Sequence, residues 1–162
     1  WLFVNLLTAI AASVAISFFD ATMEAIIALA VLMPIVASIG GNAGTQTMTV
    51  AVRALATKEL TAANMFRILS KETVVALLNG VVFAVLIGAI AWVWFESSQI
   101  GMIIATAMVF NILIAGIAGM LVPVTLDRMN IDPAIASSVF VTTVTDIVGF
   151  VAFLGLATFV LL

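Results

Sequence analysis

The sequence contains no cysteine and no histidine. Without cysteine it forms no disulfide, and it gives no indication of a redox compartment. Without histidine it lacks the commonest transition-metal ligand and the side chain that titrates nearest to physiological pH. Charged residues are scarce as well, at 8% of the chain, whereas a soluble domain holds about 25%. The net charge of -3 is too small to indicate nucleic-acid binding.

Hydrophobic residues, in contrast, make up 65% of the chain, and the mean hydropathy is +1.40. A chain of this size folding in water would need far more polar surface to cover itself. Its apolar runs are long and unbroken, whereas the strands of a membrane barrel alternate polar and apolar residues. The composition therefore predicts an all-α integral membrane protein.

Five segments are apolar enough to cross a bilayer as helices, each of which needs about 20 residues. We expect these spans at residues 2–19, 25–52, 73–95, 100–126 and 134–162. Pro133 suits the first turn of the last span, where a missing N–H costs nothing. The chain starts at Trp1 with apolar residues and lacks the basic start of a signal peptide. We therefore expect residues 1–162 to be one transmembrane domain, trimmed from a longer protein and without cytosolic regulatory domains.

The basic residues predict the orientation of these spans. All five lie in two of the junctions: Arg53, Lys58, Arg67, Lys71 and Arg128. An alternating five-span path places both junctions on one side, and an excess of basic residues marks the cytoplasmic side. We expect a multi-pass protein of the cell (plasma) membrane, with the N-terminus cytoplasmic and the C-terminus outside.

The junction before the third span also contains an amphipathic stretch, residues 61–71. Met65, Ile68 and Leu69 fall on one side of it at helical spacing. The pattern predicts a short helix lying at the cytoplasmic interface.

Two polar stripes interrupt the apolar spans at the three- and four-residue spacing of a helix face. The stripe in the second span consists of Ser38, Asn42, Thr45, Gln46 and Thr49. The stripe in the fifth span consists of Ser138, Thr142, Thr145, Asp146 and Gly149. An unsatisfied polar group in hydrocarbon costs several kcal/mol. We therefore expect these faces to meet each other or water.

The second-span stripe has two interpretations. Small and polar residues can simply hold helices together. However, Pro34 and the Gly40–Gly41 pair are expected to loosen the helix and free backbone carbonyls around Gly41. Asn42 and Gln46 add amide oxygens one turn apart. Because interrupted membrane helices often form ion sites, we favour an ion site over packing alone.

Asp146 is the strongest functional candidate. A carboxylate at the centre of a membrane helix costs at least about 2.5–3.5 kcal/mol on insertion scales, so it indicates a functional site. A buried ion pair is the structural alternative, but no Lys or Arg lies within an expected span. The carboxylate must be protonated, hydrated, or paired with a mobile cation. Together with hydroxyls such as that of Thr142, it offers hard oxygen ligands suited to Mg²⁺, Ca²⁺, Mn²⁺, Na⁺ or H⁺.

The other polar residues have simpler interpretations. Asp132 precedes Pro133 and is expected to cap the last helix, with attraction of cations to the cytoplasmic mouth as a second function. Glu72 follows Lys71 and is expected to stay in the interface. Single amides in the other spans are expected to form interhelical hydrogen bonds: Asn5, Asn79 and Asn111.

Three motifs together resemble the signature of the MgtE family of magnesium channels. They are PIVASIGGNAGTQ at 34–46, RALATKEL at 53–60 and DPAIASSVFVTTVTDIVG at 132–149. The resemblance covers the whole chain, in the number of spans and in the order of the motifs. It identifies the chain as a transport protein and not an enzyme.

The resemblance implies a homodimer in the bilayer, with a pore on the two-fold axis lined by the second and fifth spans. Asp146 of each subunit would hold a central hydrated Mg²⁺, helped by Asn42 and nearby carbonyls, while Asp132 lies where regulatory Mg²⁺ acts. Relatives also carry cytosolic Mg²⁺-sensing domains, and the resemblance implies such domains for the full-length protein. The metal candidates are thus Asp146, Asn42, Gly41, Thr142, Gln46 and Thr45, with Mn²⁺, Co²⁺ and Ca²⁺ as alternative cargo.

Other protein classes remain as alternatives. A proton- or sodium-coupled carrier would use Asp146 as its coupling residue, although no inverted repeat is evident. An intramembrane aspartyl enzyme needs two aspartates at depth, and Asp146 has no partner within the spans. In a non-conducting assembly subunit, both stripes would merely pack.

Overall fold

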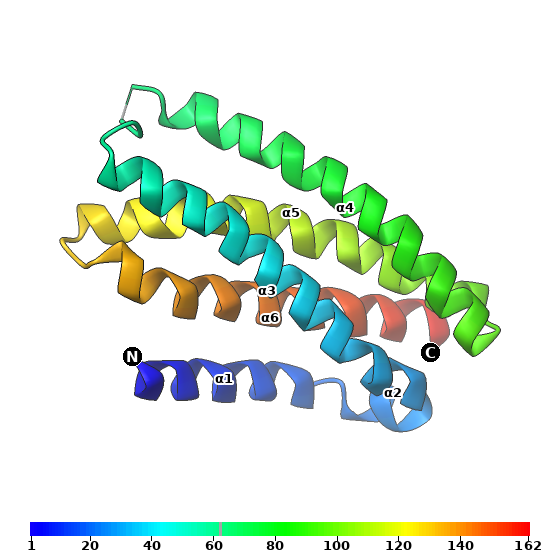
Figure 1. Ribbon diagram of the computed structural model, residues 1–162. Helices are drawn as coiled ribbons and strands as arrows, with labels where there is room; N and C mark the ends of the chain where they lie inside the picture. Colours follow the sequence, from blue (N-terminus) through cyan, green and yellow to red (C-terminus); the bar gives the residue numbers. More distant parts are fainter. Residues whose placement is uncertain (62) are drawn as a thin grey trace.

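The computed structural model describes residues 1–61 and 63–162, and the regular secondary structure of this part of the chain is entirely α-helical. Its helices run roughly along one common direction, joined by short connections, and the two termini lie at opposite ends of the bundle (Figure 1). The helices are α1 (Leu2–Ser17), α2 (Asp20–Ala25), α3 (Ile27–Ala56), α4 (Met65–Phe95), α5 (Ser98–Arg128) and α6 (Pro133–Leu161). The expectation of an all-α membrane protein is confirmed.

Four of these helices, α3 to α6, are long and apolar enough to cross a membrane. The expected first span, residues 2–19, is shorter than expected because α1 ends at Ser17 after 16 residues. At 1.5 Å per residue it extends about 24 Å, less than the hydrocarbon core of about 30 Å. The helix α1 is therefore apolar but shorter than the four membrane-length helices.

Of the expected interface helix at 61–71, residue 62 lies outside the described residues, and the described residues form no separate helix there. Met65 instead begins α4, which continues without a break to Phe95. No proline or glycine lies between Met65 and Gly80, so no helix-breaking residue separates the first turns of α4 from the rest of the helix. The expected one-sided packing of Met65, Ile68 and Leu69 is confirmed, since all three pack on a buried cluster that includes Leu60 and Met120.

The expected interruption of the second span is also wrong. The helix α3 continues across Pro34 and the Gly40–Gly41 pair. Its glycines instead allow neighbouring helices to approach, because the space that a side chain would take at Gly40 is filled by Asn111. Glycine in α3 therefore serves packing and does not open the backbone.

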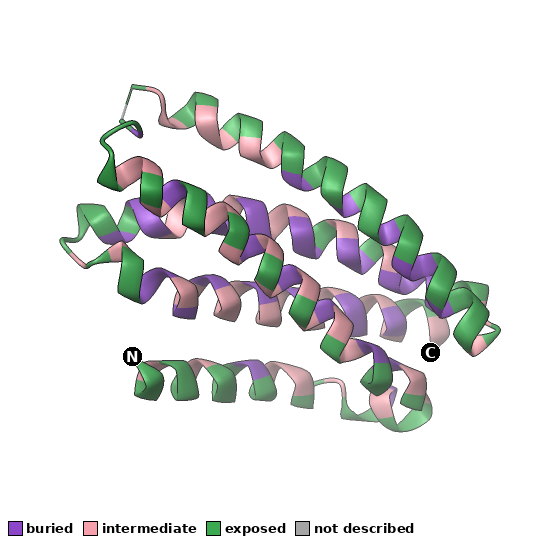
Figure 2. Cartoon of the chain, viewed as in Figure 1, coloured by how far each residue is buried: buried purple, intermediate pink, exposed green. Residues whose placement is uncertain are grey.

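The centre of the bundle is α5. Within its most apolar window 56% of the residues are buried, against 28% in each of the other three long helices. Figure 2 shows this burial on α5 and on the inward faces of α3 and α6, while the outer faces of α1 and α4 are exposed. Exposed apolar residues such as Val81, Val85 and Val93 give α4 an apolar outer surface, which suits contact with lipid.

Candidate functional site

The polar faces of α3 and α6 meet at two glycines. A side-chain carbon added to Gly41 would lie 3.9 Å from Thr142 Cγ2 and 4.0 Å from Thr145 Oγ1. At Gly44 the approach is closer, because an added carbon would lie 2.5 Å from Val141 Cγ1. The expectation that the two stripes meet holds for the glycine edge of α3 and the threonine edge of α6.

Asn111 of α5 lies between these two helices. Its side chain is fully buried, and Nδ2 donates a hydrogen bond to the Val36 carbonyl at 3.0 Å. It fills the space left by Gly40 on α3 and by Gly149 on α6. Asn111 therefore makes the expected interhelical hydrogen bond, and it sets the spacing of α3 and α6 next to the predicted site.

Asp146 follows the fully buried Thr145 on α6 and is itself half-buried. Among the described residues, its carboxylate forms no hydrogen bond and no ion pair. The hydroxyls near it donate to their own helix, Thr142 to the Ser138 carbonyl at 2.8 Å and Thr145 to the Thr142 carbonyl at 3.0 Å. Donating these hydrogens leaves the oxygen lone pairs free to accept, so this face can hold a cation or its water.

The amide side chains of α3, Asn42 and Gln46, lie beside α4. Asn42 and Gln46 are exposed and line a hollow of about 290 Å³ that Asn79 and Phe83 of α4 complete. Within the part of the chain that the structure describes, no hydrogen bond joins Asp146 to Asn42 or Gln46. That the six metal candidates act together stays a prediction.

The remaining polar atoms of the second-span stripe are used locally. Asn42 Nδ2 donates to Ser38 Oγ at 3.4 Å, and Thr49 Oγ1 donates to the Thr45 carbonyl at 2.8 Å. Among the described side chains, no group of three or more His, Cys, Asp or Glu residues could hold a metal ion. The described part of one subunit thus offers no cluster of carboxylates that would enclose an ion.

Asp132 caps α6, as expected. Its Oδ1 accepts a hydrogen bond from the Ala134 amide at 2.9 Å, and the side chain is exposed at the turn after α5. A carboxylate in this position satisfies an otherwise unpaired amide at the helix start.

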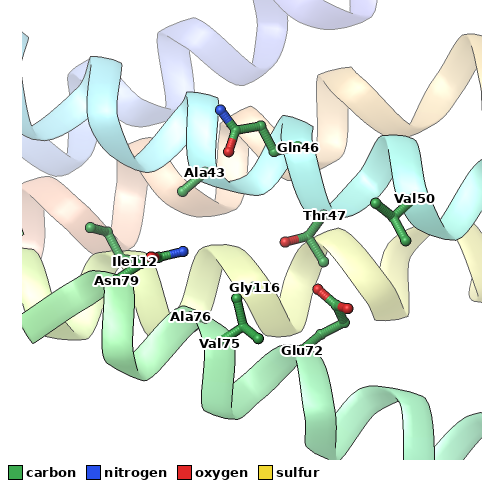
Figure 3. Close-up of a pocket in the computed structure, with 10 residues that line it drawn as sticks. All are labelled: Ala43, Gln46, Thr47, Val50, Glu72, Val75, Ala76, Asn79, Ile112 and Gly116. Atoms are coloured by element: carbon green, nitrogen blue, oxygen red, sulfur yellow. The ribbon is translucent and has the colours of Figure 1, made fainter.

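Sequence reasoning missed one polar group, Glu72. Its expected position in the interface beside Lys71 stays a prediction, and Glu72 in addition lines an intramolecular pocket with Asn79 and with Gln46 and Thr47 of α3 (Figure 3). Glu72 and Asn79 are seven residues apart and so share a helix face, which was the available signal.

Comparison with known proteins places these features in a family. A family model described as "Divalent cation transporter", MgtE, matches residues 33–156. The chain is 30% identical over 158 residues to the magnesium transporter MgtE of Bacillus subtilis, and 32% identical over 158 residues to that of Enterococcus faecalis, covering 98% of this chain in both cases. It is 32% identical over 163 residues to that of Thermus thermophilus, covering 99%.

The chain spans about a third of the length of these relatives, 35% of the first two and 36% of the third. The matched region includes most of α3, all of α4 and α5 and most of α6, and with them every predicted metal candidate. On this evidence of sequence, supported by its membrane-length helices, the chain belongs to the MgtE family of divalent cation transporters.

Proposed function

We propose that this chain is the membrane part of a transporter that conducts divalent cations, chiefly Mg²⁺, along α3 and α6. The observation that carries the proposal is the Asp146 carboxylate, which lies in a membrane-length helix without a protein partner among the described residues. Family membership supports the class of cargo.

Electrostatics explain why Asp146 points to a mobile cation. A charged carboxylate in the bilayer needs a partner or water. All five basic residues lie near helix ends or in the connections between helices, at 53, 58, 67, 71 and 128. A hydrated cation on the α3–α6 face would balance the charge, with Thr142 supplying a nearby oxygen.

A second subunit would complete the site. One carboxylate with neutral oxygen donors is a weak divalent site, and Mg²⁺ usually keeps several of its waters. A two-fold axis beside α6 would bring in a second Asp146 in matching geometry. Two carboxylates around a hydrated ion would bind it firmly enough to select it and weakly enough to release it. We therefore propose a homodimer with the pore on that axis.

We also propose that α1 is the fifth span. It lies along α6, from the edge contact of Trp1 with Phe140, ring centroids 6.1 Å apart, to Phe19 beside Gly155. Fifteen residues of α6 separate these contacts, which corresponds to about 22 Å of depth. Together with the termini at opposite ends of the bundle, this supports a cytoplasmic N-terminus and an outer C-terminus (Figure 1).

We also propose that Asp132 takes part in the regulation of transport by Mg²⁺. Asp132 is exposed at the mouth of α6, where the regulatory function implied by family resemblance would place it. Cytosolic Mg²⁺-sensing domains in the full-length protein would act from this side.

The test is Mg²⁺ uptake into liposomes, with membrane potential and pH gradient set separately. Replacing Asp146 by Asn keeps the shape and removes the charge, so we expect uptake to fall to near background. Asp20→Asn is the matched control, because this aspartate is exposed at the start of α2. Near-normal uptake by Asp146→Asn would contradict the assignment. Uptake that requires a proton or sodium gradient would replace the channel by a coupled carrier.

A further inference from the structure

A second polar pocket lies on another face of α3, between α3 and α4. It has a volume of about 140 Å³, and its polar lining comes from Gln46 and Thr47 of α3 and from Glu72 and Asn79 of α4. Figure 3 shows the Glu72 carboxylate across the gap from the Thr47 side chain, whose oxygen points along the gap toward the side of Asn79. The pocket does not include Asp146.

Packing onto α5 creates this pocket. A side-chain carbon added to Gly116 would lie 2.5 Å from Ala76 Cβ, so α4 and α5 are in close contact there. In contrast, α4 makes few contacts with α3. The two helices therefore diverge above Ile112 and Gly116, which form the floor, and their polar side chains line the space between them.

The Glu72 carboxylate has no counter-charge within this space. It forms no ion pair or hydrogen bond with any residue in 1–61 or 63–162. Lys71 is exposed, and successive residues on a helix do not face each other. The half-buried Glu72 carboxylate shares its pocket with two amides, one hydroxyl and apolar side chains, and it has no cationic side chain beside it among the described residues.

The donors and the room suit a hydrated ion. All four side chains offer oxygen, the ligand that hard cations prefer. A cavity needs about 10–15 Å³ of space for water centres to hold one water, so a pocket of about 140 Å³ has room for an ion with part of its shell. A neighbouring hollow of about 290 Å³ shares Gln46, Asn79 and Ile112 and extends the polar surface to Asn42.

We propose that the pocket formed by Glu72, Asn79, Gln46 and Thr47 is a second binding site for a hydrated divalent cation, contained within one subunit. The class of cation rests on the proposed function, but the site itself does not use Asp146 or a dimer axis. Glu72 lies about two turns from the start of α4, at the end of the bundle where the basic residues gather. An ion held there would sit beside Gln46 of the proposed pathway.

Binding of Mn²⁺, followed by electron paramagnetic resonance on the purified chain in lipid nanodiscs, tests the proposal. Monovalent salt is kept high so that surface charges are screened. We expect Glu72→Gln to abolish one class of bound Mn²⁺ and Asp146→Asn to abolish another, with the double variant losing both. Glu59→Gln, at an exposed glutamate of the α3–α4 connection, is the matched control and should bind as the wild type does.

A second variant tests the amide. Asn79→Leu keeps a similar volume and should weaken the Glu72-dependent Mn²⁺ by about tenfold or more, the usual effect of losing an outer-shell partner. Circular dichroism and gel filtration would confirm that each variant keeps its fold.

The proposal is overturned if Glu72→Gln binds as many Mn²⁺ ions as the wild type, or if Glu59→Gln loses as many. These results are independent of the transport assay. A loss of uptake in Asp146→Asn with unchanged Mn²⁺ binding in Glu72→Gln would leave the proposed function intact and remove only the second site.

Discussion

At the scale of single residues, the two glycines of α3 that face α6 have different amounts of room. The carbon added at Gly41 meets its nearest neighbour at 3.9 Å, an ordinary contact, whereas the carbon added at Gly44 meets Val141 at 2.5 Å. We expect Gly41→Ala to leave stability nearly unchanged and Gly44→Ala to cost about 1–3 kcal/mol through overpacking. Thermal unfolding of both variants in the same detergent compares them, and equal melting temperatures would contradict the helix spacing described here.

The packing of Asn111 against Gly40 allows a sharper test. A methyl at position 40 would overlap the Asn111 side chain, so Gly40→Ala should cost about 1–3 kcal/mol. Asn111→Ala removes the hydrogen bond to the Val36 carbonyl. An interhelical hydrogen bond in a membrane protein contributes about 0.6 kcal/mol on average. The substitution also leaves an empty space beside Gly40.

That space is where the new methyl would go. The double variant should therefore cost less than the sum of the two single ones, a coupling that a double-mutant cycle of unfolding free energies measures. Strict additivity would show that the two positions do not share this space.

At the scale of helices, two substitutions at the start of α6 distinguish the capping function of Asp132 from the effect of its charge. Asparagine caps about as well as aspartate, whereas alanine does not, and losing a cap costs about 1 kcal/mol. We expect Asp132→Ala to lower the melting temperature and Asp132→Asn to leave it unchanged. If uptake in Asp132→Asn then responds differently to internal Mg²⁺, the charge has the regulatory function implied by the family. An equal loss of stability in both variants would contradict the capping geometry.

Helix α3 shows why a sequence pattern can suggest the wrong local structure. Proline and paired glycines predict an interrupted helix, because one lacks an N–H and the others favour many conformations. In the bundle, Gly40 and Gly44 lie against Asn111 and Val141, and these contacts hold the helix continuous.

At the scale of the whole molecule, the absence of cysteine makes the topology measurable. Single cysteines at Leu2, Ser98 and Met129, all exposed and at or next to helix ends, can be labelled by an impermeant reagent. If α1 spans the membrane, Leu2→Cys and Met129→Cys should react only from the cytoplasm and Ser98→Cys from outside. Labelling of Leu2→Cys from outside would show that α1 does not cross, because the crossing of α3 already fixes the side of the connection between α1 and α3.

The sequence by itself determined the class of the protein and the extent of most helices. Scarce charge and long apolar runs require a membrane environment. There the chain forms helices, because each helix pairs its own backbone N–H and C=O groups and the hydrocarbon offers no other partner. Asp146 was identifiable as a candidate site residue because a carboxylate in the middle of such an apolar run is costly in the bilayer. The cap at Asp132 was predictable because a helix start needs only local contacts.

Only the tertiary structure decided which neighbour each polar residue faces. Successive residues turn by about 100° around a helix, so one stripe can serve two partners. Gly41 faces α6, while Asn42 and Gln46 face the hollow beside α4. Glu72 enters a pocket because α4 leans on α5 at Gly116 and away from α3. Such contacts depend on helix crossings that join residues far apart in the chain, and no local pattern encodes them.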